Sequence, residues 1–377
     1  MQPRKGSGGP AYSILTVAVG LVLFLTWAYP LRERALSGHN DFLQLYAGAT
    51  LVGTPELYSI EASKSVHRRL TGTWYPSVYY TRLPFYAAML SPLGKLPYAT
   101  AYWTWQSISI TILVAFFWCY VPLYRELPLL AALSVPLLGN LLNGQDAGIV
   151  MALAGFSVLL VRRGRDFAAG LLLSLCAIKF HLFVLVPVAL ILCRRWNILK
   201  GGLTGGLVLA MVSFAADGLD WPVRFFAMVT NPELHPGPEH MPTLRGLVFP
   251  FAGDNRALEL LLTALVVALF AWLAWRICSF EIVFGLSLVA GLLVCHHAYI
   301  QDCVLLLLPL ALFHIGGASR WLRGVATVLV LPPAYFMLLH GTPYNVAVPL
   351  LLVSVLLAAI WDTHDGSDRA PAGSGAA

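Results

Sequence analysis

Long apolar runs separated by short polar connections make up most of this chain. Helices are expected at about residues 11–29, 99–121, 127–142, 146–162, 166–179, 180–195, 199–217, 256–276, 281–297, 301–315, 320–339 and 344–361. A bilayer core is about 30 Å thick and takes about 20 apolar residues per helix. The pattern therefore predicts an all-α polytopic membrane protein, a bundle of about 12 transmembrane helices with a range of roughly 10 to 13.

Three stretches need a separate interpretation. The first run, 11–29, follows Arg4 and Lys5 and has no small-residue cleavage site, so a retained signal anchor is expected. The two runs that meet at Lys179 are shorter than a full crossing, which predicts tilted or broken helices there. Residues 83–96 contain two internal prolines and are too short to span comfortably, so we expect a helix at the outer interface.

Composition excludes a soluble domain. Hydrophobic residues make up 58% of the chain and charged residues only 11%, whereas soluble domains carry about 25% charged residues. The six cysteines are scattered without a CxxC pair, so neither a zinc site nor a disulfide framework is indicated. One transmembrane domain is expected over residues 1–361, followed by a disordered cytoplasmic tail at 362–377.

The net charge of +6 indicates orientation and not nucleic-acid binding. If the N-terminus is cytoplasmic, alternation of the helices places the basic connections on the same inner side, together with the C-terminus. These connections carry Arg125, Arg162, Arg163, Arg165, Arg194, Arg195, Lys200, Arg276, Arg320 and Arg323. The distribution predicts a multi-pass protein of the cell membrane.

The chemically varied residues fall on the opposite, extracytoplasmic side. That side receives the first external loop at 30–98, with its interfacial helices, and the external loop at 218–255. It also receives the turns "NGQDAG", "KFH", "HHAYIQD" and "HGTPYN". Eight of the ten histidines lie in or beside these segments, so a site built from several turns is expected on this face.

Known motifs narrow the chemistry of such a site. The chain has no G-x-x-x-x-G-K-[ST] loop for a nucleotide and no convincing repeat of the kind that transporters show. No D-x-D pair occurs in the external segments, which argues against a nucleotide-sugar donor held by a divalent metal. An enzyme acting on a lipid-borne substrate at the outer leaflet fits best. A transporter or flippase of lipid-linked sugars and a non-catalytic scaffold stay open as alternatives.

Five stretches of the chain resemble, in order, landmarks of glycosyltransferase family 87. They are "DFLQLYAGATLVGTPELY", "RLPFYAAMLSPLGKLP", "NGQDAGIVMALAG", "AGLLLSLCAIKFHLFVLVPVALILCRRW" and "HHAYIQDCVLLLLPL". The resemblance extends from about residue 12 to 315. It implies a membrane-embedded bundle of the C-type glycosyltransferase superfamily. The implied partners are a polyprenyl-phosphate-linked hexose, as in the mycobacterial α-1,2-mannosyltransferases, and a glycolipid or glycan acceptor. No cofactor and no metal is implied.

The resemblance implies that one aspartate of the first external loop acts as the general base, and Asp41 matches that position. A carboxylate that removes the acceptor's hydroxyl proton as the glycosidic bond forms performs ordinary base catalysis. Alternatively, Asp41 caps the helix that begins at Phe42, which is a common role for aspartate. The two roles can coexist.

The leaving phosphate calls for cationic or hydrogen-bonding groups. Lys179 interrupts an apolar run, where a charged residue is functional by default, although a lysine near a helix end can also snorkel to the interface. His181 can help only if the chain is unwound there, because residues i and i+2 do not share a helical face. Arg82 stands where the family more often has a Tyr-Pro-Pro-like sequence, and binding of the donor phosphate or of a lipid headgroup are both open.

Further polar residues are candidates for binding sugar or acceptor. Gln145 and Asp146 follow Gly144 in a tight turn, and Gln145 either binds sugar hydroxyls or stabilises the turn. His240 and Arg245 lie in a loop rich in proline and glycine, of a kind that often forms a binding lid.

The "HHAYIQD" turn completes the candidate site. Adjacent histidines on a helix point about 100° apart, so His296 and His297 are not expected to chelate one metal ion. Asp302 is expected to orient His297 or a sugar. Both His297 and Asp302 are therefore assigned to the sugar and acceptor part of the site.

Overall fold

The structure, a computed structural model, describes residues 37–72, 79–231 and 237–364, together with positions 18, 22 and 33. This described part is helical and contains no strand, which confirms the predicted all-α class. Apart from positions 18 and 22, the predicted span at 11–29 lies outside the described residues, and so does the tail beyond residue 364.

The segment predicted to be the first external loop contains three short helices. These are α3 (Phe42–Leu51), α4 (Ile60–Thr71) and α5 (Pro84–Gly94). The segment expected not to cross is the 11-residue α5, which has Pro84 in its first turn and Pro92 inside it. Gly94 lets α5 approach the backbone of α3, because a Cβ there would lie 2.5 Å from the Ala49 carbonyl oxygen.

The remaining helices follow with few long connections. They are α6 (Tyr98–Tyr120), α7 (Leu127–Ala132), α8 (Val135–Leu142), α9 (Ala147–Arg162), α10 (Asp166–Ser174), η2 (Leu175–Phe183), α11 (Val186–Leu192), α12 (Trp196–Asp217), α13 (Trp221–Val229), η4 (Pro238–His240), α14 (Leu244–Ala252), α15 (Arg256–Arg276), α16 (Phe280–Val294), η5 (Ile300–Leu306), α17 (Leu307–Ile315), α18 (Arg320–Val330), α19 (Pro332–His340), η6 (Tyr344–Val346) and α20 (Ala347–His364).

Many of the predicted spans are broken into shorter pieces. Within the described residues, four helices are long and apolar enough to cross a membrane, and two bent pairs raise this number to at most six. The pair α8 and α9 is bent by 119°, where the chain passes through the turn at residues 143–146. These helices support a membrane protein. The count of about 12 spans stays a prediction.

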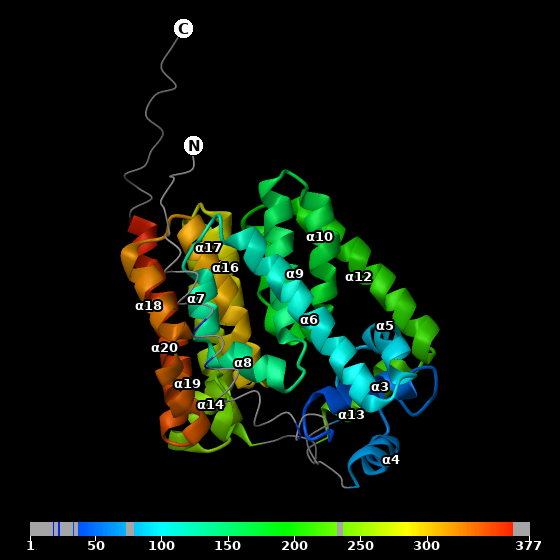
Figure 1. Ribbon diagram of the computed structural model, residues 1–377. Helices are drawn as coiled ribbons and strands as arrows, with labels where there is room; N and C mark the ends of the chain where they lie inside the picture. Colours follow the sequence, from blue (N-terminus) through cyan, green and yellow to red (C-terminus); the bar gives the residue numbers. More distant parts are fainter. Residues whose placement is uncertain are drawn as a thin grey trace.

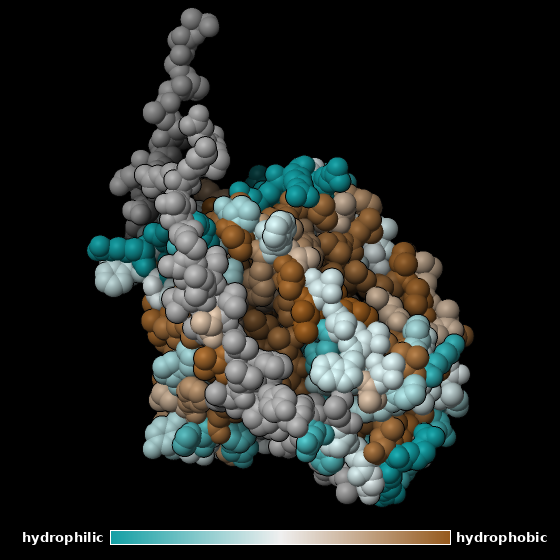
Figure 2. All heavy atoms as spheres, in the orientation of Figure 1, coloured by the Kyte–Doolittle hydropathy of each residue, from teal (hydrophilic) through white to brown (hydrophobic). Residues whose placement is uncertain are grey.

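The bundle has two polar ends and an apolar middle. Figure 1 places α3, α4 and α13 at one end, and the connection between α9 and α10 at the other. In Figure 2 an apolar belt lies between polar residues that gather at the two ends of the visible face. At the basic end, Arg162 Nη1 lies 2.8 Å from Glu281 Oε1, and Arg195 Nη1 lies 3.7 Å from Asp166 Oδ2. The predicted basic connections at residues 162–165 and 194–195 are therefore neighbours.

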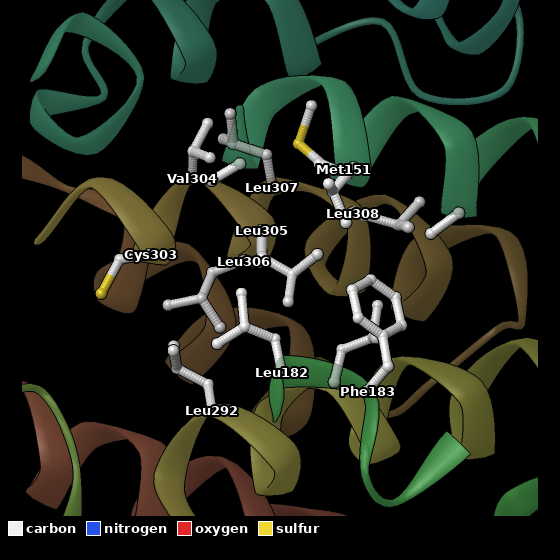
Figure 3. Close-up of a cluster of buried hydrophobic side chains, with 14 of the residues drawn as sticks. Met151, Leu182, Phe183, Leu292, Cys303, Val304, Leu305, Leu306, Leu307 and Leu308 are labelled. Atoms are coloured by element: carbon white, nitrogen blue, oxygen red, sulfur yellow. The ribbon is translucent and has the colours of Figure 1, made fainter. Parts of the chain in front are cut away.

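The hydrophobic core fixes the segments that carry the polar site. Figure 3 shows one cluster of buried side chains that includes Met151 of α9, Leu182 and Phe183 of η2, Leu292 of α16 and residues 303–306 of η5. Leu182 and residues 304–306 are almost completely buried. These apolar residues follow directly after the polar residues of the "KFH" and "HHAYIQD" turns, so close packing of the core holds both turns in place.

Helices α10 and α12 cross at glycines. A Cβ on Gly201 would collide with the carbonyl oxygen of Phe167, and one on Gly170 with the carbonyl oxygen of Ile198. Small residues at a crossing let helix backbones approach closely in a membrane protein. Gly206 on the same helix faces open space.

We expect Gly201→Ala to destabilise the protein by about 1 to 3 kcal/mol, because the added methyl forces the two backbones apart. Thermal unfolding of the purified protein in detergent measures this. The matched change Gly206→Ala adds the same methyl in open space and should not lower the unfolding temperature. Equal unfolding temperatures for the two variants would contradict the close crossing.

Candidate active site

A cavity of about 470 Å³ opens at the end of the bundle that carries α3 and α13. Its lining comes from residues 41–82 around α3, the turn before α9, η2, α13 and the turn that leads into η5. The lining residues are Asp41, Gln44, Tyr79, Thr81, Arg82, Gln145, Lys179, Phe180, His181, Phe225, Met228, Val229, His296, His297, Tyr299, Gln301 and Asp302. The structure thus brings together most of the residues predicted to form a site.

Asp41 is half-buried and precedes α3 without capping it. Asn40 makes the side-chain hydrogen bond at this end, because its Oδ1 accepts from the Phe42 backbone N–H at 2.9 Å. Asp41 Oδ2 accepts from Gln145 Nε2 at 2.9 Å and from Gln301 Nε2 at 3.0 Å. The capping alternative for Asp41 is therefore wrong.

A tight turn brings Gln145 to Asp41. Gly144 has a φ of +63°, which favours glycine, and a Cβ there would lie 2.7 Å from Phe42 Cβ. The Phe42 N–H also donates to the carbonyl oxygen of Asn143 at 2.9 Å. Trp105 Nε1 donates to the Gly144 carbonyl oxygen at 2.8 Å, which fixes the turn from the α6 side.

Lys179 reaches the site because the helix breaks at this residue. Its backbone has φ −129° and ψ 55°, outside the helical range, and the surrounding segment is the 3₁₀ helix η2. The predicted break is confirmed. It also places His181 on the same cavity as Lys179, which a regular helix would not do.

The Lys179 ammonium is buried and surrounded by oxygen atoms. Its Nζ lies 2.6 Å from Asp302 Oδ1, 3.3 Å from Asp146 Oδ1 and 3.3 Å from Gln145 Oε1. An ammonium has three N–H groups, so these three oxygens can account for all of them. Lys179 is only 3% exposed, and it does not snorkel to a membrane surface.

Arg82 forms the second buried cation of the site. Its Nε and Nη2 donate to the two oxygens of Asp146 at 3.0 and 3.1 Å, and its Nη1 donates to Thr81 Oγ1 at 2.7 Å. Such a bidentate pair fixes the plane of the guanidinium. Because Arg82 is buried and paired in this way, the lipid-headgroup alternative does not describe it.

Asp302 is held by η5 and by Lys179. Besides the ion pair, its Oδ2 accepts from the Tyr299 backbone N–H at 2.9 Å. The hydrogen bonds of this carboxylate thus orient Lys179 and the start of η5. The expectation that Asp302 orients His297 or a sugar stays a prediction.

Three carboxylates and two cations form one connected network. Burial raises the pKa of Asp41, and the hydrogen bond from Gln145 together with the charges of Lys179 and Arg82 partly offsets this effect. Asp302 adds to the increase in the pKa of Asp41. With neutral histidines and an ionised Asp41, the network carries a net charge of about −1.

One wall of the cavity is apolar and aromatic. Phe225 and Met228 come from α13, and Phe180 lies next to Lys179 in η2. The Phe180 and Phe225 ring centroids are 6.4 Å apart. His296 lies at the cavity and its Nδ1 is 2.7 Å from Glu259 Oε1. The cavity thus combines a charged floor with an apolar wall.

Three predicted site residues do not line this cavity: Asp146, which is completely buried and paired with Arg82 and Lys179, and also His240 and Arg245. His240 Nδ1 lies 3.2 Å from the Leu338 carbonyl oxygen, beside α19. Arg245 donates to both oxygens of Asp254, from Nε at 3.0 Å and from Nη2 at 3.2 Å, so its charge is largely neutralised. The structure does not bring His240 and Arg245 to Asp41.

Sequence reasoning missed Gln301, although the "HHAYIQD" turn was selected as a whole. A neutral glutamine beside an aspartate gives no charge signal, and its partner Asp41 lies 260 positions away in the chain. Within the described residues, no three His, Cys, Asp or Glu side chains converge in a way that could hold a metal ion.

The apolar helices indicate a protein associated with a membrane, and the comparison with known families identifies it as a glycosyltransferase. Residues 80–296 match Glycosyltransferase family 87, and because this is more than half of the chain, the protein belongs to that family. The matched region includes Arg82, Gln145, Lys179 and His296, whereas Asp41 and residues 297–302 lie outside it. No curated protein and no solved structure matches the chain.

We expect Lys179→Met to destabilise the protein by about 3 kcal/mol or more, because Asp302 and Asp146 then lose a buried partner. Combining it with Asp302→Asn should recover part of the loss. Thermal unfolding of the two single variants and the double variant measures the coupling. Additive losses would contradict the pairing, and the exposed Lys95→Met serves as a control with little expected effect.

Proposed function

We propose that this protein transfers a hexose from a polyprenyl-phosphate-linked donor to an acceptor hydroxyl, without a metal ion and with Asp41 as the general base. The observation that supports this most is the state of the Asp41 carboxylate. Oδ2 accepts two amide N–H groups, whereas Oδ1 accepts no hydrogen bond from a described residue. Since Asp41 lines the cavity, one carboxylate oxygen is available to a substrate.

The reaction is a single displacement at the anomeric carbon. The acceptor oxygen forms its bond to this carbon while its proton passes to Asp41 Oδ1. The bond between the anomeric carbon and the phosphate oxygen breaks, and the polyprenyl phosphate leaves with the bonding electron pair. This displacement inverts the anomeric configuration, and one base opposite the leaving phosphate is sufficient.

The donor phosphate is bound mainly by Arg82 in this proposal. Three of the five guanidinium N–H groups are used by Asp146 and Thr81, so two are available at the cavity. Lys179 has no such surplus, because three protein oxygens already surround its ammonium. Its charge still attracts the phosphate, and His181 offers a further hydrogen bond. Arg82, Lys179 and His181 therefore all act on the donor phosphate, and Arg82 contributes most.

Sugar and acceptor occupy the part of the cavity near Gln145, His297 and Asp302. The apolar wall of Phe180, Phe225 and Met228 accommodates the first isoprene units of the carrier. We assign mannose as the sugar and a glycolipid or glycan as the acceptor, following the resemblance to the mycobacterial enzymes.

The site is assigned to the extracytoplasmic side of the plasma membrane, with both chain ends in the cytoplasm. The 16 residues of α9 separate the site from the basic end by about 24 Å along the helix. Basic residues favour the cytoplasmic side, so the end with Arg162 faces inward and the cavity outward. A transporter or flippase would need its polar site near the middle of the membrane.

Asp41→Asn should lower the transfer rate by about 10²- to 10⁴-fold, because the amide cannot accept the proton. The measurement is release of free polyprenyl phosphate by purified protein from a panel of polyprenyl-phosphate hexoses with an acceptor present. Binding of the donor should persist. Asp166→Asn, at the basic end, is the control and should keep the wild-type rate. Wild-type release by Asp41→Asn would contradict the base.

The transfer rate should fall as the pH decreases through the pKa of Asp41. Because burial raises this pKa, the acidic limb of kcat/KM should lie above about pH 4, the value for an ordinary aspartate. The donor is a phosphodiester and does not titrate in this range, so the limb reports the enzyme. An acidic limb at or below the pKa of an ordinary aspartate would contradict an aspartate base in this environment. A rate that does not fall at low pH would contradict it as well.

A further inference from the structure

Two glutamine side chains converge on a single oxygen of Asp41. Gln145 Nε2 lies 2.9 Å and Gln301 Nε2 lies 3.0 Å from Oδ2. Gln145 belongs to the turn before α9, and Gln301 to η5, so the carboxylate is held from two separate segments. Both glutamines line the cavity beside Asp41.

We propose that Gln301 is a positioning residue of the transfer reaction, which together with Gln145 fixes the Asp41 carboxylate so that Oδ1 faces the acceptor hydroxyl. This inference rests on the proposed role of Asp41 as the base. Two N–H donors on one oxygen stop the carboxylate from rotating about its Cβ–Cγ bond. They also favour the ionised form, which is the form that can accept a proton.

The neighbours of Gln145 determine which end of its amide faces Asp41, and the backbone next to Gln301 is anchored as well. Gln145 Oε1 accepts from the Lys179 ammonium at 3.3 Å, and this leaves its Nε2 to donate to the carboxylate. Gln301 precedes Asp302, which is anchored by Lys179 Nζ and by the Tyr299 N–H. The buried network therefore orients the donors of Asp41 before any substrate binds.

The charges around Asp41 show why such donors matter. Burial opposes ionisation of the carboxylate, and the nearby Asp302 opposes it further. Lys179 and Arg82 favour it, but both are shared with Asp146 and Asp302. The other titratable residues that line the cavity are Tyr79, His181, His296, His297 and Tyr299, and Tyr98 lies close enough to Asp41 to interact with its charge. The N–H groups of the two glutamines carry no net charge. They stabilise the ionised form of Asp41 without forming an ion pair with it.

Two substitutions separate positioning from packing. Gln301→Met keeps the length of the side chain and removes the donor, whereas Gln301→Glu places a second carboxylate against Asp41. Both should lower kcat more than they change the KM for the donor. The acidic limb of the pH profile should move up by about 0.5 to 1 pH unit for Gln301→Met and by more than about 1 unit for Gln301→Glu. In Gln301→Glu, the acidic limb reports the titration of the two neighbouring carboxylates together.

Gln44→Met is the matched control, because Gln44 lines the same cavity but its side chain does not donate a hydrogen bond to Asp41. Its acidic limb should coincide with that of the wild type, whatever its rate. Unfolding temperatures of all variants identify a misfolded protein. Should Gln301→Glu fail to fold, the limb of Gln301→Met decides the question alone.

The outcomes distinguish this inference from the proposed function. Shifted limbs in the Gln301 variants, with an inactive Asp41→Asn, support the positioning role. Unmoved limbs with an inactive Asp41→Asn overturn the role of Gln301 and leave the base in place. Transfer by Asp41→Asn at the wild-type rate overturns the base and, with it, the role of Gln301.

Discussion

The buried ammonium of Lys179 is the constraint on which the rest of the site depends. It joins Asp302, Asp146 and Gln145, which come from η5 and from the turn before α9. A charge that is removed from water must be paired and hydrogen-bonded. The break in η2 lets Lys179 meet these partners, and the apolar residues beyond each turn pack into one core (Figure 3). Charge pairing and core packing therefore require the same arrangement of the three segments.

This arrangement sets the environment of Asp41. Arg82 and Lys179 share Asp146, and Gln145 connects Lys179 to the carboxylate of Asp41. A base in such a site is preorganised, because its donors are already in place in the absence of substrate. The network also neutralises most of its own charge, so the groups available to a phosphate are the two remaining N–H groups of Arg82 and the histidines. Stability of the bundle and the proposed binding of an anionic donor thus depend on the same residues.

Much of this could be predicted from the sequence, because isolated charges in apolar runs are costly. Lys179 stood out for that reason, whereas Asp41 was assigned through the resemblance to family 87 and Asp302 through its place in a polar turn. The sequence also predicted the break at Lys179 and the family itself. Other features depend on long-range pairing. The hydrogen bond from Gln301 links two distant loops and carries no charge signal. Arg245 looked like a binding residue, yet its partner Asp254 lies only nine positions away. The number of spans could not be read reliably, since helices such as α8 and α9 bend sharply.

A structure of Asp41→Asn with a polyprenyl-phosphate hexose and an acceptor bound would test the central claim most directly. The account predicts that the anomeric carbon lies between the side chain at position 41 and the phosphate, with the acceptor oxygen within hydrogen-bond distance of that side chain and Arg82 in contact with the phosphate. A sugar bound elsewhere in the bundle, or a phosphate on the side of residue 41 that faces the acceptor, would contradict it.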